Sequence, residues 1–139
     1  MAYTKAGIRF SKDSYVTVDA SGGGGIERKL LWENPDPSQE MDGSTMFEES
    51  ELEGYTYIAF TVATTGGNVI TEEWCEIEPL KAAGGQFIVS QPHNGKLYGR
   101  KIYRSSGAVK ASTAVYELGK TIEDRSTCIV TKVEAVKIG

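Results

Sequence analysis

The chain alternates apolar and polar residues in short runs that are separated by glycine-rich turns. In one run, Ile58, Phe60 and Val62 occupy every second position, the period of a strand with one buried face. Gly66-Gly67 follows this run and predicts a hairpin turn. No stretch combines helix caps with a sustained 3.6-residue period, although residues 46–52 have the pattern of a helical turn. The sequence therefore predicts β structure along nearly its whole length.

Further runs of the same kind predict the remaining strands. From Val69 to Leu80 an amphipathic strand is expected, with Ile77 and Pro79 on one face and Trp74 on the other. Pro79 would mark its end or an exposed edge, because proline lacks the amide donor that a ladder needs. The other expected strands are 14–18, 29–32, 86–91, 96–104, 109–118 and 127–138, with turns at 84–85, 92–95 and 105–107.

These runs define the expected fold class and domains. About eight or nine short strands without alternating helices predict an all-β fold, an antiparallel β-sandwich or jelly roll. A length of 139 residues fits one such domain, which we place at residues 26–139. Residues 1–25, with four glycines at 22–25, predict an N-terminal arm with a glycine-rich linker, or extra strands of the same domain. An arm that crosses to a neighbouring subunit and a hairpin within the domain fit equally well.

The net charge of −4 hides a strong segregation of charge along the chain. Residues 33–78 contain twelve acidic and no basic side chains, whereas residues 1–32 carry +2 and residues 79–139 carry +6. One interpretation is that acidic and basic strands pair across a sheet. The other is that an acidic face and a basic face orient subunits or partners. A net acidic chain also argues against a general nucleic-acid binder.

The sequence gives no signal for a membrane span or for secretion. It lacks a run of 18 apolar residues, and residues 1–10 lack the apolar core of a signal peptide, so we expect no membrane partner and synthesis in the cytoplasm. Cys75 and Cys128 form no CxxC pair. We expect two reduced core thiols on strands, and a disulfide between them outside the cell stays open.

No constellation of residues predicts an enzyme. A nucleophilic triad needs a base, and the single histidine, His93, lies in a predicted turn beside Asn94. The GxSxG and GxxxxGK[ST] patterns are absent. Paired carboxylates could hydrolyse a glycoside, but twelve acids in one block bring some pair together by chance. The loop from Glu33 to Asp42 offers oxygen donors of the kind calcium takes, without the EF-hand spacing, and we expect no cofactor or metal.

Aromatic residues on the predicted strands are the best candidates for a ligand site. Aromatic side chains on strands are more often core or edge packing than ligand contacts. They could instead form a platform on which sugar rings stack, with nearby amides and acids. The residues that we single out for ligand binding are Trp74, Tyr98, Tyr103, His93 and Asn94, with Trp32 and Tyr116 as further members of such a platform.

Two stretches resemble a known pattern. Residues 29–37, KLLWENPDP, with Leu52-Glu53-Gly54-Tyr55 after a polar loop, resemble the opening of a small β-rich domain in tail, baseplate and fibre proteins of phages and prophages of Gram-positive bacteria. Residues 100–107 and 128–137 resemble the end of that domain. Val130-Thr131 and Glu134-Ala135 depart from its Pro-Leu and Tyr-Gly, and residues 1–25 have no counterpart.

The resemblance implies a non-enzymatic virion component, made in the bacterial cytoplasm and assembled into the virion. It implies a homo-oligomer, with a trimer favoured, whose partners are other virion proteins and which contributes to host-surface attachment. The residues add that Pro35 and Pro37 would rigidify the connection after Trp32, which would anchor it to the core. The alternative is a carbohydrate-binding β-sandwich module for bacterial surface glycans.

Overall fold

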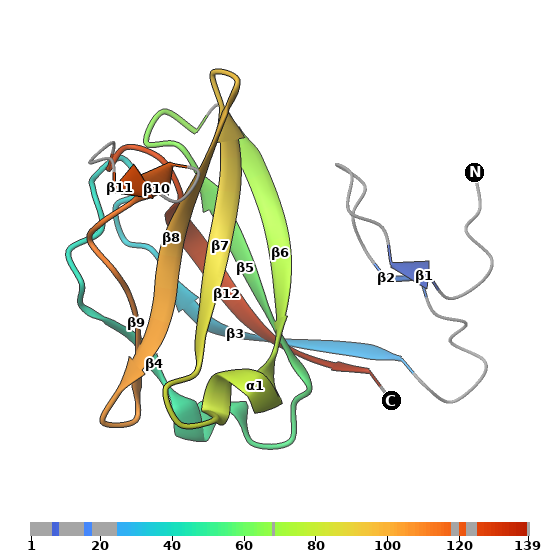
Figure 1. The fold of residues 1–139 in the computed structure, drawn as a ribbon. Coiled ribbons are helices and arrows are strands. Elements are labelled where there is room, and N and C mark those ends of the chain that lie inside the picture. The colour runs from blue at the N-terminus through green and yellow to red at the C-terminus, as the bar shows by residue number, and fades with distance from the viewer. Residues whose placement is uncertain are drawn as a thin grey trace.

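Two antiparallel sheets pack together as a β-sandwich in the computed structural model, which describes residues 7–8, 16–17, 25–67, 69–117, 120–121 and 125–138 (Figure 1). The four-stranded sheet has the order β3 (Ile26–Glu33), β12 (Ile129–Ile138), β5 (Tyr57–Ala63), β6 (Ile70–Glu76). The six-stranded sheet has the order β11 (Lys120–Thr121), β10 (Tyr116–Glu117), β8 (Lys96–Ser105), β9 (Ala108–Ala111), β4 (Thr45–Glu48), and β7 (Gln86–His93) also pairs with β8. The predicted antiparallel all-β sandwich is confirmed.

The core lies between the two sheets and is built by the period-two pattern. Ile58, Phe60 and Val62 of β5 are fully buried in one cluster with residues of the other sheet such as Ile102. Phe60 stacks on Phe87 of β7, with ring centroids 5.7 Å apart and planes at 17°. Fully burying one such side chain contributes about 1.5–3 kcal/mol, so this seam holds the sheets face to face.

Two-residue turns set the register of the hairpins. Asn94 and Gly95 have φ of +52° and +76°, as a type I′ turn requires, and β7 pairs with β8 from His93↔Lys96 onward. The turn predicted over residues 92–95 is thus shorter, because Pro92 and His93 continue β7. A second pair with positive φ, Ser106 and Gly107, joins β8 to β9, as predicted.

The strand predicted from Val69 to Leu80 ends early. It stops at Glu76, and Ile77–Lys81 form the short helix α1. Ile77 and Leu80, three residues apart, are both buried, while Pro79 is exposed. Proline is tolerated in the first turn of a helix, where its missing amide has no partner, so the expected period of two gives way to a helical one.

The strand predicted over residues 109–118 is broken into β9 and β10, and Arg100 of β8 lies opposite the break. Its buried guanidinium donates from Nε to the carbonyl of Cys128 at 2.8 Å and from a terminal nitrogen to that of Thr127 at 3.0 Å. It also donates to the carbonyls of Ser112 and Arg125. Burial lowers the pKa of Arg100 to about 10, so the side chain is still a cation at neutral pH.

The other sequence predictions have mixed outcomes. Both cysteines are buried thiols, but only Cys75 lies on a strand, because Cys128 precedes β12 in a left-handed conformation with φ of +52°. The helical turn expected in residues 46–52 is the 3-10 helix η2 (Glu49–Leu52), which follows β4. Of residues 1–25, only Gly25 and the paired strands β1 (Gly7–Ile8) and β2 (Val16–Thr17) are described, and the predicted arm lies outside the described residues.

No helix within the described ranges is long and apolar enough to cross a membrane.

Candidate ligand pocket beside Trp32

The loop that follows β3 is fixed to the four-stranded sheet by Asn34. The backbone amide of Asn34 donates to the carbonyl of Thr131 at 2.9 Å, and its side-chain amide donates to the carbonyl of Val130 at 2.9 Å. The side-chain oxygen of Asn34 accepts a hydrogen bond from the amide of Asp36 at 2.9 Å. This residue therefore directs the chain out of the sheet, and Trp32, two residues earlier, packs against the core as expected.

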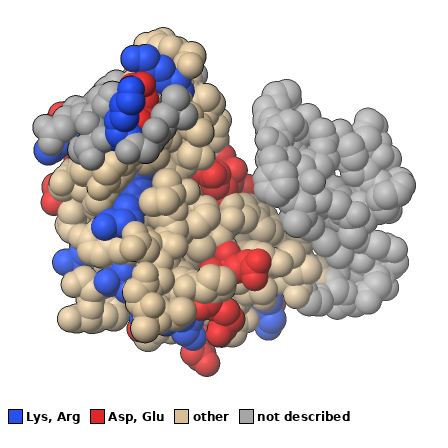
Figure 2. All heavy atoms as spheres, viewed as in Figure 1, with Lys and Arg blue, Asp and Glu red and all other residues tan. Residues whose placement is uncertain are grey.

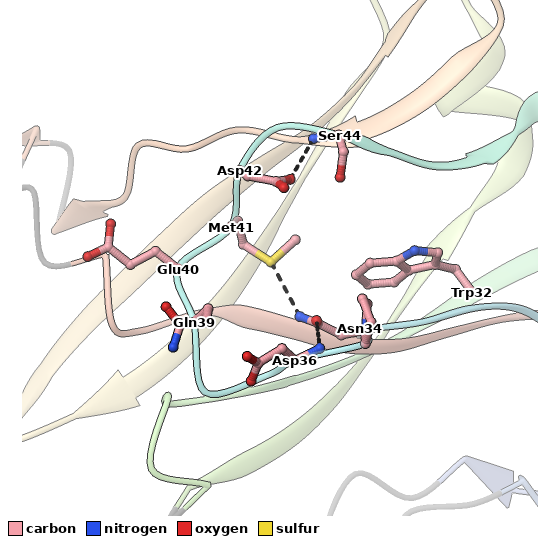
Figure 3. A pocket seen from close by; sticks show the side chains of 9 residues that line it. Trp32, Asn34, Asp36, Gln39, Glu40, Met41, Asp42 and Ser44 are labelled. Carbon is pink, nitrogen blue, oxygen red and sulfur yellow. Dashed lines mark hydrogen bonds between the residues drawn. The ribbon is translucent and has the colours of Figure 1, made fainter.

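The loop encloses a pocket of about 240 Å³ beside Trp32 (Figure 3). Figure 3 shows the Asp42 carboxylate and the Ser44 side chain on the same side of the loop as the Trp32 ring, whereas Glu40 points away from it. The thioether sulfur of Met41 lies between Asp42 and Asn34, 3.9 Å from the side-chain nitrogen of Asn34. The wall thus combines one aromatic face with oxygen acceptors.

The pocket is electrostatically negative. The described residues that line it include Asp36, Glu40 and Asp42 but no Lys or Arg. Hydrogen bonds from Ser44, through its side chain and then its backbone, lower the pKa of Asp42, whose Oδ1 accepts from the Ser44 amide at 2.9 Å. Asp36 likewise accepts from the Ser38 hydroxyl at 2.5 Å. Both carboxylates therefore accept hydrogen bonds from the loop itself, which fixes their position beside the pocket.

The described residues contain no group of three or more His, Cys, Asp or Glu side chains that could hold a metal ion.

Trp74 lies on β6, an edge strand of the four-stranded sheet, and is held by its neighbours. Its indole N–H donates to Glu72 at 3.1 Å, and the Arg28 guanidinium lies 5.4 Å from its ring centroid. Tyr57 packs beside it at 5.6 Å between centroids. Arg28 also binds Glu72 and Glu134 at 3.0 and 2.8 Å. Trp74 is therefore part of a cluster that crosses four strands on the outer face of this sheet.

The other predicted ligand residues are not gathered into one platform. His93 and Asn94 lie at the β7–β8 hairpin, where the Asn94 amide is 3.2 Å from His93 Nε2. Tyr98 is only 6% exposed and packs in a second apolar cluster with Val115 and Cys128. Tyr103, on β8, pairs with Gln86 of β7 and with Lys110 of β9. Because 98 and 103 are an odd number of positions apart on one strand, the two tyrosines point to opposite faces.

The outer faces of the two sheets differ in charge. On the six-stranded sheet, the ladder pairs place Lys101 and Lys110 on the outer face with Tyr103 and Tyr116, and Glu48 is the one acidic residue of the described strands there. Figure 2, which views this face, shows basic side chains mainly over β8 and β9 and acidic ones toward β6 and α1. On the four-stranded sheet the outer face carries Arg28 and Lys132 against Glu33, Glu72, Glu76 and Glu134.

Both outer faces also carry exposed apolar groups. Ile88 and Leu97 on the six-stranded sheet are 50% and 45% exposed. The four-stranded sheet has a largely apolar groove of about 410 Å³ near the β5–β6 turn, with Ala63 and Ile70 in its lining. Ile70 is 67% exposed. Exposed apolar side chains thus lie on both outer faces, and the four-stranded sheet also carries a groove.

No protein-family model, curated protein or solved structure matches the chain.

Proposed function

We propose that the chain is a non-enzymatic structural component of a phage or prophage tail, baseplate or fibre that self-associates. The observation that carries this proposal is the contrast between the outer faces of the sandwich, one basic with protruding Ile88 and Leu97, the other acidic with a groove beside Ile70. The resemblance of residues 29–37 and of the segments from residue 100 onward to phage tail domains supports the class of protein.

The two faces fit a contact between different surfaces of neighbouring copies. The basic face of one copy, with Lys101 and Lys110, would meet the outer-face carboxylates of the next. Complementary charge orients such a contact and speeds its formation. A head-to-tail contact forms a closed ring or an open filament according to its rotation, and the resemblance implies the closed form with three copies.

Sedimentation velocity with light scattering tests this proposal directly. We expect a trimer at low ionic strength that dissociates as salt screens the charges, since the Debye length falls from about 30 Å at 0.01 M to about 3 Å at 1 M. The double variant Lys101→Glu with Lys110→Glu should be a monomer, while the control Lys137→Glu, at an exposed position of β12, should not change the mass. A wild-type monomer at every concentration and salt contradicts the proposal.

Membership of a virion requires a separate experiment. Purified particles from the source bacterium, fractionated into capsids and tails, should contain the chain in the tail fraction at a fixed ratio to other tail proteins by mass spectrometry. Its absence from all particle fractions would contradict the virion assignment while leaving self-association intact.

A carbohydrate-binding module for bacterial surface glycans is the second candidate. The observation that favours it is the pocket beside Trp32, where an aromatic ring and carboxylate oxygens line one hollow. Host wall polysaccharide should then change tryptophan fluorescence, and a glycan array should show binding. No binding in either assay would remove this candidate.

A further inference from the structure

We infer that the pocket beside Trp32 binds one sugar unit that is neutral or carries an amine, and that it rejects acidic sugars. The inference rests on the glycan-binding candidate and names its site and the chemistry of its ligand. It places the site in the loop of residues 34–44, away from Trp74 and the β7–β8 hairpin.

The size of the pocket sets the size of the ligand. Pockets for drug-sized molecules span about 300–1,000 Å³, so a volume of about 240 Å³ suits a single sugar ring. The pocket is only partly enclosed, which leaves room for the rest of a glycan chain to extend into solvent. A terminal sugar or a branch is the expected unit.

Trp32 supplies the stacking surface. Its ring packs partly against the core, so its position is fixed before a ligand arrives, and a preformed site costs less ordering entropy on binding. Among the described residues the indole N–H of Trp32 has no hydrogen-bond partner. The indole N–H of Trp74, in contrast, donates to Glu72. The Trp32 N–H can therefore donate to a sugar hydroxyl.

The carboxylates select against acidic sugars. Asp36 and Asp42 accept hydrogen bonds from Ser38 and Ser44, and an ionised carboxylate has about four acceptor lone pairs, so each can also accept from a sugar hydroxyl or an ammonium group. An ionised carboxylate bonds to such donors about twice as strongly as a neutral acceptor. The described residues of the lining include no Lys or Arg, so among them an acidic sugar would meet only like charge, which selects against it.

Titration calorimetry and NMR with the full chain test the inference. The probes are the methyl glycosides of glucose, galactose, N-acetylglucosamine, glucosamine and glucuronic acid. We expect millimolar binding of at least one neutral or amino sugar and none of the glucuronide. Trp32→Ala should weaken binding about tenfold, because it removes the aromatic surface on which the sugar ring stacks. The matched control Trp74→Ala should bind as the wild type does.

Trp32 contacts the core, so a second variant guards against misfolding. Asp42 is exposed, and Asp42→Asn keeps the shape of the side chain while removing its charge. It should weaken the amino sugar most and lessen the rejection of the glucuronide. Binding that neither variant alters, or a glucuronide that binds as tightly as glucose, overturns the inference and leaves glycan binding at another site. If no sugar binds, the glycan-binding candidate itself fails.

Discussion

Replacing Arg100 with methionine should be among the most destabilising single changes in the domain. Methionine has a similar length and flexibility but cannot donate, so the carbonyls of Cys128, Thr127 and Ser112 lose the hydrogen bonds that Arg100 donates to them. These acceptors are backbone atoms that no compensating substitution removes. The change therefore differs from the replacement of a whole buried ion pair by apolar residues, which is often neutral.

The size of the effect follows from the number of bonds. A hydrogen bond to a charged group contributes about 1.5–3 kcal/mol, and a buried polar atom left without a partner costs about 1–3 kcal/mol. The segment before β12 can move and let water reach some of the carbonyls, so the contributions do not add fully. We expect a loss of about 3–5 kcal/mol in the free energy of unfolding, a large part of the roughly 5–15 kcal/mol of a typical domain.

Urea unfolding followed by circular dichroism measures this loss. It should lower the midpoint of thermal unfolding by about 10–20 °C, judged from the usual scaling with chain length. Lys137→Met is the control, since it makes the same kind of replacement at an exposed position of β12 and should change the free energy by no more than about 0.5 kcal/mol. A loss below about 1 kcal/mol for Arg100→Met would refute the view that the guanidinium holds the segment before β12.

Three further predictions concern other parts of the chain. Burial raises the pKa of Glu72, but hydrogen bonds from Arg28 and Trp74 outweigh it, so the pKa lies below its usual value. Glu72→Gln should then cost up to about 1 kcal/mol at neutral pH, and the difference should vanish as the pH falls through the pKa of the folded state; a pH-independent difference would contradict this. Burial, followed by the charge of Glu76, raises the pKa of Cys75 to about 11, so it should react with a thiol reagent at pH 8 far more slowly than in urea, and equal rates would be the contrary result. Deleting residues 1–25 should lower the oligomer order but leave the β-rich circular dichroism spectrum if these residues exchange between subunits, whereas an unfolded product would show that they supply integral strands.

The parts of the fold that depend on neighbouring residues were accessible from the sequence. The alternation around Phe60 and the turn residues Asn94-Gly95 report local backbone geometry, so the strands and hairpins follow from them. The sequence did not show where β6 ends, because two spacings of apolar residues overlap there. Ile77 and Pro79, two positions apart, fit a strand, and Ile77 and Leu80, three positions apart, fit a helix equally well. Burial of Leu80 by the rest of the molecule decides between the two.

The candidate site was harder to predict because it depends on contacts between distant segments. Asn34 shapes the pocket through a hydrogen bond to the carbonyl of Val130, 96 positions later in the chain. No local sequence pattern predicts that contact. Trp32 was one of several aromatic candidates, and nothing in the sequence separated it from Trp74, whose indole N–H is already bonded to Glu72. A signal did exist for the tyrosines, since the odd spacing of Tyr98 and Tyr103 within one strand already places them on opposite faces.

Self-association through faces of opposite charge is tested most directly by mixing two face variants and measuring sedimentation velocity. One carries Lys101→Glu and Lys110→Glu, and the other carries Glu33→Lys and Glu76→Lys, all at outer-face positions. Each alone should sediment as a monomer because like charges meet, and an equimolar mixture should form species larger than the monomer because the reversed faces match. A mixture that sediments as two unassociated monomers, or variants that associate as the wild type does, would contradict the proposed assembly.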